Sequence, residues 1–503
     1  MDTQFPLAPV ADLPWLAYAS LLVIAVYFRF SRALTIRNLD LLLILLIAAA
    51  VVVSSHFRDL PYNAGEADSP SSKSVTSLAL PHSELQEFDS NSTVGVDPVL
   101  DSVAGIHPMS TGSTLALVVL AVLLVVRLLF DESLTRRPRL DQNLNQAGLT
   151  FLCVPAFAIL AFGVFLKPAP VTNVKAIEHG RALLQRREVE VSNQLNDVPA
   201  PTETLIAAGG AAVAQLSGTL PNSVSINNGA TRDTELLVAR ILVVVAHMVV
   251  ILGLVYIGRQ HFASVQLGVA MSCLYLLLPC TAANVHKLSH VLPAACLIWA
   301  IASYRKPAVA GVLLGLACGT LFFAIFLLPL WAVFYGRRGA LRFGASVLGV
   351  VLVLATCLMM ISGDADSFFY RVVSSTNWTV YQLLDDAPGI SQTPISHLFI
   401  RIPMAAIFFV MLTAMTVLPR PRNLENLLAN STALVVAAQM WYPDDIGSYV
   451  QWYMPLFLLV VFRPRLDRFM PPDTIERQAA VVPGGLNVGS QSIVAMSHMS
   501  GYR

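Results

Sequence analysis

The sequence predicts an all-α protein, a bundle of helices that crosses a membrane many times. The first reason is composition, because 55% of the 503 residues are hydrophobic and only 13% are charged. So few charges could not solvate the surface of a soluble domain of this length. The second reason is that apolar stretches of bilayer length recur from Pro14 to Phe462. The third is that basic residues occupy alternate gaps between these stretches.

A helix needs about 20 mainly apolar residues to cross the hydrocarbon core, since every backbone polar group must be satisfied within the segment. By this criterion the polytopic bundle has about thirteen transmembrane spans. In chain order they are Pro14–Phe30, Leu39–Ser55, Ser113–Phe130, Gly148–Leu166, Leu236–Ile257, Ser264–Ala283, Leu288–Ser303, Val309–Gly319 and Leu321–Tyr335 as a hairpin, Phe343–Ile361, Leu398–Leu418, Leu424–Met440 and Gly447–Phe462.

Basic residues fill every second gap, and the positive-inside rule places these gaps in the cytoplasm. They are Arg29, Arg32, Arg37, Arg136, Arg137, Arg139, Arg259, Arg305, Lys306, Arg337, Arg338, Arg342, Arg420, Arg422, Arg463, Arg465 and Arg468. The N-terminus is therefore predicted outside and the C-terminus in the cytoplasm. The residues before Pro14 are acidic rather than basic, so no cleavable signal peptide is predicted.

This alternation divides the chain into consecutive parts. They are the first two spans at 1–55, a largely irregular exterior loop at 56–112, spans three and four at 113–166, a second exterior loop with an amphipathic helix at 167–235, the main helical core at 236–463 and a disordered cytoplasmic tail at 464–503. The first loop is rich in Ser, Asp and Pro, a composition typical of irregular structure. All six cysteines lie inside predicted spans, so the outer loops have no disulfide framework.

The second exterior loop contains an amphipathic segment, Ala176–Leu195. Ile177, Leu184 and Val191 recur there at heptad spacing among charged residues. This spacing predicts a helix that lies on the membrane surface or on the other loops. We expect its three apolar side chains to point toward lipid or toward the ends of the spans.

Polar residues at the predicted exterior ends of the spans form three groups: the turn NVHKLSH, the segment WYPDDIGSYVQWY and a set of arginines. The candidate binding residues in these groups are Arg240, His286, Lys287, His290, Arg401, Asp444, Asp445, Tyr449 and Trp452. Cationic groups near the headgroups attract phosphate. We therefore expect Lys287, His290 and Arg401 to approach one another, in a bundle whose roomy polar cavity lies on the exterior side.

Simpler interpretations stay open for each group. Aromatic residues near span ends commonly form an interfacial belt, which would account for Trp441–Tyr453. Arginines one turn into a span, such as Arg240 and Arg401, commonly extend their side chains to the headgroups. His286 and His290 are four residues apart and would share a helix face. Two histidines alone are a weak indication of a metal ion, and no metal site is predicted.

Two further polar positions have structural interpretations. His247 lies in the middle of a span, and we expect it to hydrogen-bond a neighbouring helix. Asp364 and Asp366 have a spacing found among metal-binding carboxylates, but in an exterior loop we expect them to be solvated charges. The sequence predicts no cofactor and no nucleic-acid partner.

The stretch SHVLPAACLIWAIASYRKPAVAGVLLGLACGTLFFAIFLLPLWAVFYGRRGALRF, Ser289–Phe343, resembles the core of multi-spanning glycosyltransferases of the GT-C class, especially the bacterial members that depend on polyprenol-phosphate-mannose. A helix that starts near the outer face is followed by a small basic turn, an AG-x-LLGLA helix and an LLP-containing helix that ends in arginines. The segment Trp441–Pro464 is similar to the last span of that class, with an aromatic entrance followed by WxxPLxxL.

This resemblance implies a GT-C-like protein of a bacterial inner membrane, with membrane lipid around it and a polyprenyl-phosphate sugar as its donor. In that class a carboxylate of the first exterior loop acts as general base on the acceptor hydroxyl, and basic groups stabilise the leaving phosphate. The catalytic candidates here are Asp59, Glu66, Asp68 and Glu178. None lies in a motif of the class, and the Lys and Pro that often follow AG-x-LLGLA are replaced by the residues GTLF at 319–322.

Two other functions compete with sugar transfer. A transporter or flippase for a lipid-linked substrate predicts charged residues deep within several spans, and His247 is the one ionisable residue that we place at mid-span. A non-catalytic membrane scaffold predicts no convincing catalytic carboxylate. The donor sugar, the acceptor and the oligomeric state do not follow from the sequence.

Overall fold

The computed structural model describes most of the chain as helices joined by short connections. It describes residues 12–32, 34–58, 108–131, 142–189, 198–218, 229–320, 322–375, 398–418, 421–441, 449–464, 466 and 469–472. The α-helices are α1 (Asp12–Tyr27), α2 (Ile36–Arg58), α3 (Pro108–Leu129), α4 (Gln146–Leu166), α5 (Val171–Gln185), α6 (Pro201–Leu216), α7 (Gly229–Gln260), α8 (Val265–Leu277), α9 (Pro279–Ala283), α10 (Leu288–Ala302), α11 (Pro307–Cys318), α12 (Leu327–Ile361), α13 (Ala365–Ser375), α14 (Leu398–Val417), α15 (Leu424–Trp441) and α16 (Val450–Phe462).

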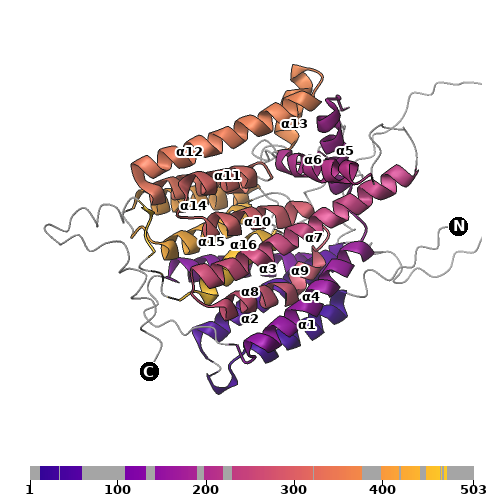
Figure 1. The fold of residues 1–503 in the computed structure, drawn as a ribbon. Coiled ribbons are helices and arrows are strands. Elements are labelled where there is room, and N and C mark those ends of the chain that lie inside the picture. Colours follow the sequence, from indigo (N-terminus) through magenta and orange to yellow (C-terminus); the bar gives the residue numbers. More distant parts are fainter. Residues whose placement is uncertain are drawn as a thin grey trace, which may run out of the picture.

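Within the described residues, five helices are long and apolar enough to cross a membrane by their length and composition. They contain the segments Ile36–His56, Gly112–Leu129, Gln146–Leu166, Arg232–Gln260 and Phe323–Ile361, the last of which folds back on itself at Gly336. Shorter apolar helices pack beside them, and the long helices run side by side in Figure 1. Large apolar side chains such as Phe151 and Leu348 are exposed on the outer face, as expected where lipid rather than water is the solvent. The chain is thus a helical membrane protein.

The predicted spans fall on observed helices, and one of them is broken. The span predicted at Ser264–Ala283 divides into α8 and α9, because the helix ends at Leu277 and restarts at Pro279. Leu278 between them is extended. A proline lacks the N–H that would continue the helical ladder, but it is well accommodated in the first turn of the next helix.

Helix α12 reverses direction at Gly336 and is a hairpin rather than one long helix. Gly336 has φ 69° and ψ −177°, which is non-helical. The rings of Trp331 and Phe343 stack with their centroids 6.4 Å apart, although twelve residues of straight helix would separate them by about 18 Å. The predicted return of the chain between Tyr335 and Phe343 is therefore present.

Helix α11 packs against the second half of this hairpin in a parallel direction. A Cβ added at Gly311 would meet the Phe343 carbonyl oxygen at 2.5 Å, and one at Gly315 would meet Val350 at 3.0 Å. From the first contact to the second, the residue number increases on both helices. Helix α11 and residues 343–361 are therefore parallel. Glycine is needed at these positions because the helices approach too closely for a side chain.

Helices α5, α6 and α13 gather at one end of the bundle, on the right of Figure 1; we call it the α5–α6 end. A Cβ at Gly180 would lie within 3.0 Å of the α6 backbone, so α5 and α6 cross closely. Ile177 is 1% exposed and packs with Ala207 and Ala214 of α6 and Val238 of α7. The helical hairpin therefore packs on the end of α7 through small residues.

The amphipathic helix is shorter than predicted. Helix α5 ends at Gln185 rather than continuing to Leu195, because Arg186 adopts the left-handed conformation (φ 52°) and its amide caps the last turn. Leu184 is 43% exposed and does not share the buried environment of Ile177. Val191 lies outside the described residues.

The opposite end of the bundle is joined by a network of buried charges. Arg127 of α3 donates two hydrogen bonds of 2.8 Å to Asp40 of α2 and one to Asp131. Arg463, just after α16, pairs with Asp131 and, at 2.9 Å, with Glu425 of α15. Each buried charge faces an opposite one, which is the condition under which charges can be buried.

Candidate active site at the α5–α6 end

The first turn of α6 is seated on the end of α11. The Thr202 amide donates to the Gly319 carbonyl at 3.1 Å, and the Thr202 hydroxyl donates to the Leu316 carbonyl at 2.8 Å. A Cβ at Gly319 would approach both the Thr202 hydroxyl and Leu354 more closely than real Cβ contacts allow. Thr202 thus satisfies carbonyls that the end of a helix leaves without intrahelical partners.

The next residue, Glu203, carries a buried carboxylate. Its side chain is in the first turn of α6 and the residue is 2% exposed. Burial raises the pKa of Glu203 to about 7, although a hydrogen bond with the Ala200 backbone opposes this effect. Its Oε1 atom has no hydrogen-bond partner among the described residues. A buried carboxylate with a free oxygen and a pKa near neutrality can exchange a proton with a bound group.

Cationic groups cluster at the same end of the bundle, around the turn between α9 and α10. The Lys167 ammonium donates to the carbonyls of Ala282 and Ala283 at 3.2 and 3.0 Å. Burial first, then the charges of Lys167 and Lys287, lower the pKa of His286 to about 4. The side-chain amide of Asn173, in α5, donates a hydrogen bond to the His286 backbone carbonyl at 2.8 Å. Lys167, His286 and Lys287 form what we call the cationic turn, which the first turn of α5 holds in place.

Aromatic rings pack against one another beside the cationic turn. His290 is 5% exposed, and its ring stacks on that of Tyr449, with centroids 4.8 Å apart and planes 17° apart. Phe323 contacts the rings of Tyr449 and Trp452 edge to face. The Trp452 indole donates to the Ser289 carbonyl at 3.3 Å. These contacts pack the starts of α10 and α16 tightly against each other.

Two arginines connect the remaining elements at the α5–α6 end. Arg181 of α5 pairs with Glu235 of α7, and Arg371 of α13 donates to the Val189 carbonyl. Burial, together with Arg371 and Lys175, lowers the pKa of His179 to about 4. Charge repulsion and burial therefore keep His179 neutral at physiological pH, with the guanidinium of Arg371 as the fixed charge beside it.

The candidate binding residues are brought together only in part. His290, Tyr449 and Trp452 meet in the aromatic packing, and His286 and Lys287 meet in the cationic turn. Arg240 lies beside α4, with its guanidinium carbon 5.9 Å from the centroid of the Phe165 ring. The side chain of Arg401 and the residues Asp444 and Asp445 lie outside the described part of the chain. The proposed approach of Arg401 to Lys287 stays a prediction.

Of the four catalytic candidates, the structure describes only Glu178. Asp59, Glu66 and Asp68 lie outside the described residues. Glu178 is on an exposed position of α5, and its pKa is raised by burial and by the charge of Glu235. Glu203 was not predicted from the sequence. Its signal was the order Pro201, Thr202, Glu203 at the start of an Ala-rich segment, a pattern typical of a helix N-terminus.

The interfacial-belt interpretation is wrong for the described aromatic residues of Trp441–Tyr453. Trp441 is 2% exposed, Trp452 is fully buried and Tyr453 is 3% exposed. Trp441 packs against Phe326 and α14, and Trp452 packs against Phe323 and the start of α10. The aromatic ring contacts of Tyr449 and Trp452 provide the physical reason, since burying these large surfaces within the bundle is more favourable than leaving them at its rim.

Two single-residue predictions are confirmed. His247, fully buried in α7, bonds to the Tyr275 hydroxyl at 2.9 Å and to the Val285 carbonyl at 3.1 Å. A carbonyl only accepts, so Nε2 carries the proton and Nδ1 accepts from Tyr275. Asp364 is exposed, and its carboxylate accepts from the Ser367 amide at 2.9 Å, at the start of α13.

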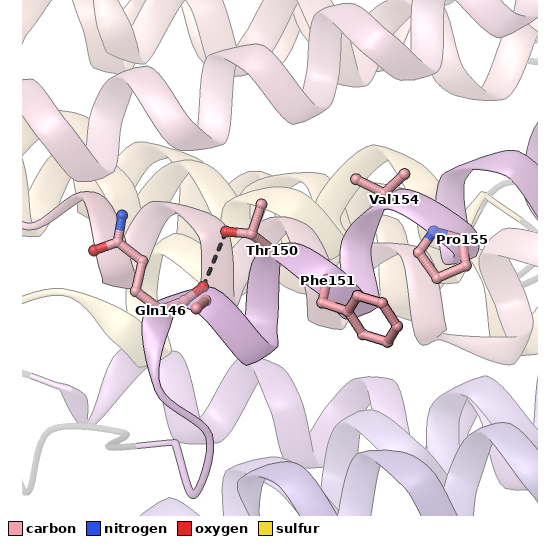
Figure 2. Close-up of a pocket in the computed structure, with 6 residues that line it drawn as sticks. Gln146, Thr150, Phe151, Val154 and Pro155 are labelled. Atoms are coloured by element: carbon pink, nitrogen blue, oxygen red, sulfur yellow. Dashed lines mark hydrogen bonds between the residues drawn. The ribbon is translucent and has the colours of Figure 1, made fainter.

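Two concave regions formed by the described residues lie away from this end, and the polar cavity expected on the exterior side stays a prediction. A largely apolar groove of about 850 Å³ follows the first half of α4, past Gln146, Phe151 and Pro155. In Figure 2 the Thr150 hydroxyl bonds back to the Gln146 carbonyl along its edge. A polar cavity of about 190 Å³ lies at the opposite end of the bundle.

Within the described residues, no group of three or more His, Cys, Asp or Glu side chains is arranged to hold a metal ion. Comparison of the chain with protein-family models, curated proteins and solved structures found no match.

Proposed function

We propose that the protein is a membrane glycosyltransferase with a GT-C-like architecture, which moves a sugar from a polyprenyl-phosphate donor to an acceptor on the exterior face. The observation that carries this proposal is the buried carboxylate of Glu203, at the same end of the bundle as the cationic turn. Glu203 takes the place of the four carboxylates that the sequence suggested as catalytic.

A general base works best when its pKa lies near the working pH, because it must be ionised and still able to take a proton. Burial brings the pKa of Glu203 to about 7, and its Oε1 is without a protein partner among the described residues. In the proposed reaction this oxygen accepts the proton of the acceptor hydroxyl. The oxygen of that hydroxyl then forms a bond to the anomeric carbon as the bond to the donor phosphate breaks.

The cationic turn supplies the second requirement, stabilisation of the departing phosphate. Lys167, His286 and Lys287 lie together at the ends of membrane-spanning helices. Positive charges in a partly desolvated location stabilise a phosphate more than they do in bulk water. The low pKa of His286 makes it a neutral hydrogen-bonding group, so the two lysines carry the charge.

The membrane layout proposed from the sequence suits this chemistry. With about thirteen spans and the positive-inside orientation, the α5–α6 end faces the exterior in a bacterial inner membrane. The segment Ser289–Phe343, which resembles the GT-C core, contains α10, α11 and the first half of α12. The carboxylate-bearing turn of α6 is seated on this segment through Thr202 and Gly319.

The test is sugar transfer by the purified full-length protein in lipid nanodiscs, using a panel of polyprenyl-phosphate sugars with labelled sugar. We expect Glu203→Gln to lose transfer by about a hundredfold or more, the usual effect of removing a general base. Lys287→Ala should reduce transfer, whereas Arg342→Gln, an exposed charge at the other end of the bundle, should not. Equal activity of Glu203→Gln and the unmodified protein would refute the role of Glu203. Absence of transfer with every donor would favour the scaffold.

A further inference from the structure

The polar cavity of about 190 Å³ lies at the end of the bundle opposite Glu203. It is formed where α7 and α10 end and α11 begins. α10 starts at the α5–α6 end, beside His286, and finishes at this cavity. The proposed transfer site therefore lies at the other end of α10, and the cavity has no part in it.

One wall of the cavity is aromatic. The rings of Tyr256 and Trp299 stack with centroids 5.5 Å apart and planes 29° apart. The Trp299 indole is fixed by donating to the Val249 carbonyl at 3.0 Å. Tyr256 is 42% exposed on the outer side of the apolar helix α7. Aromatic side chains at such a position are typical of the membrane–water interface.

The other wall is basic. Arg305 and Lys306 line the cavity and are exposed. Arg305 is oriented by its hydrogen bond of 3.1 Å to the Tyr304 hydroxyl, and its guanidinium carbon lies 5.7 and 5.9 Å from the ring centroids of Tyr304 and Phe469. A guanidinium held between aromatic rings is pre-organised, and its remaining donors can bind an oxyanion.

The helix ends at the cavity do not cancel this charge. The exposed carbonyls at the end of α10 would repel an anion, but His261 Nε2 donates to Ala302 at 2.9 Å and the Ser303 hydroxyl donates to Trp299 at 2.7 Å. α11 begins at Pro307 directly after Lys306, and no side chain caps its first turn. The positive end of that helix dipole adds to the two cationic side chains.

None of the described residues that line the cavity carries a carboxylate. We propose that this cavity binds the phosphate of an anionic membrane-lipid headgroup. Arg305 and Lys306 contact the phosphate oxygens, and Gln260 binds a headgroup hydroxyl. Tyr256 and Trp299 cover the glycerol and the first carbons of the chains. The lipid is favoured over free phosphate because the aromatic wall continues onto the membrane-facing side of α7.

Native mass spectrometry of the full-length protein tests this proposal, with phosphatidylglycerol and phosphatidylcholine as competing lipids. We expect the unmodified protein to retain phosphatidylglycerol preferentially. The double variant Arg305→Gln/Lys306→Gln should weaken retention about tenfold or more, the effect of losing charge-assisted hydrogen bonds. Lys306→Gln alone leaves the ring contacts of Arg305 intact and should give a smaller loss in a protein that folds normally.

Arg259→Gln is the matched control, because Arg259 is an exposed arginine in the last turn of α7 that does not line the cavity. It should leave retention unchanged. An equal loss with Arg259→Gln would show only diffuse surface charge and would overturn the proposal. Displacement of the lipid by millimolar inorganic phosphate, with the same dependence on Arg305 and Lys306, would assign the cavity to free phosphate instead. Equal retention of phosphatidylcholine and phosphatidylglycerol would also contradict the proposal of an anionic-lipid site.

Discussion

Thr202 and Gly319 are joined by a hydrogen bond of 3.1 Å between the Thr202 amide and the Gly319 carbonyl, across a contact that leaves no room for a side chain at 319. This contact holds the first turn of α6, and with it Glu203, against the end of α11. The Lys and Pro often found near this position in the GT-C class are absent here. A small residue is required at 319 because another helix is seated on it.

The substitution Gly319→Ala tests this seat. The added Cβ would collide with the Thr202 hydroxyl and Leu354, and overpacking of this kind costs about 1–3 kcal/mol. We expect a lower midpoint of thermal unfolding in detergent and reduced sugar transfer. Gly349→Ala is the control, because a Cβ at 349 meets nothing within 4 Å. Equal midpoints for the two variants would mean that α6 is not held there.

The pH dependence of stability tests the environment of Glu203. Its pKa is about 7 in the folded protein against 4.5 for the ordinary side chain, so the folded state holds more protons between these values. Stability should therefore fall as the pH rises from about 4.5 to 7, by at most about 3 kcal/mol, and remain lower above that range. Glu203→Gln should raise the unfolding midpoint at pH 8.5 and change it little at pH 4.

This measurement separates the two roles of Glu203. A variant that is more stable at high pH but inactive identifies a carboxylate kept for chemistry rather than for stability. If the midpoint of Glu203→Gln falls at pH 8.5, the carboxylate is instead a stabilising partner in the folded state, and its assignment as a base is wrong.

The buried charge network predicts a large effect for Arg463→Gln. Arg463 has a fully buried side chain between Asp131 and Glu425. Its removal leaves two buried carboxylates without this counter-charge, which costs about 3–5 kcal/mol. Thermal unfolding and the yield of folded protein should both drop, whereas Arg342→Gln, at an exposed position, should have little effect. Similar behaviour of both variants would show that the network contributes no stability.

The hydrogen bond from Tyr275 to His247 predicts a cost for Tyr275→Phe. The substitution leaves the buried Nδ1 of His247 without its donor, which costs about 1–3 kcal/mol. Unfolding of the variant should begin at a lower temperature. Tyr18→Phe removes a hydroxyl from a residue that is 71% exposed and should leave the midpoint where it is. A neutral result for Tyr275→Phe would require another donor to reach His247.

The proposed orientation predicts which positions a membrane-impermeant maleimide can reach. Cysteine at Glu178, on α5, should react in intact cells, and cysteine at Arg342, in α12, only after the inner membrane is opened. The unmodified protein is the control, since its cysteines lie in the apolar helices. The reverse pattern of labelling would invert the topology and place Glu203 in the cytoplasm.

Much of the helical layout could be predicted because hydropathy is a local property. The span predicted at Leu288–Ser303 is α10, the one at Leu424–Met440 is α15, and the reversal between Tyr335 and Phe343 is present at Gly336. Local chemistry also predicted that His247 would hydrogen-bond a neighbouring helix. A segment that must satisfy its own backbone in lipid forms a helix whatever its neighbours are.

The candidate site was less predictable because its environment is built by distant segments. Glu203 looks like any carboxylate in the first turn of a helix, and its raised pKa exists only because the tertiary fold buries it. The aromatic residues near Trp452 looked interfacial, and only packing between α10 and α16 shows them to be core. Length and apolarity do not say which face of a helix is covered.

The sequence by itself determined that this chain is a helical membrane protein, roughly where most of its apolar helices lie, and which gaps are basic, because each depends on neighbouring residues. Only the tertiary structure decided that Thr202 meets Gly319 and that Asp131 pairs with Arg463, 332 positions further along the chain. Such pairs depend on how helices cross in space. In a lipid environment, close packing and the pairing of buried charges favour one arrangement among many that share the same hydropathy.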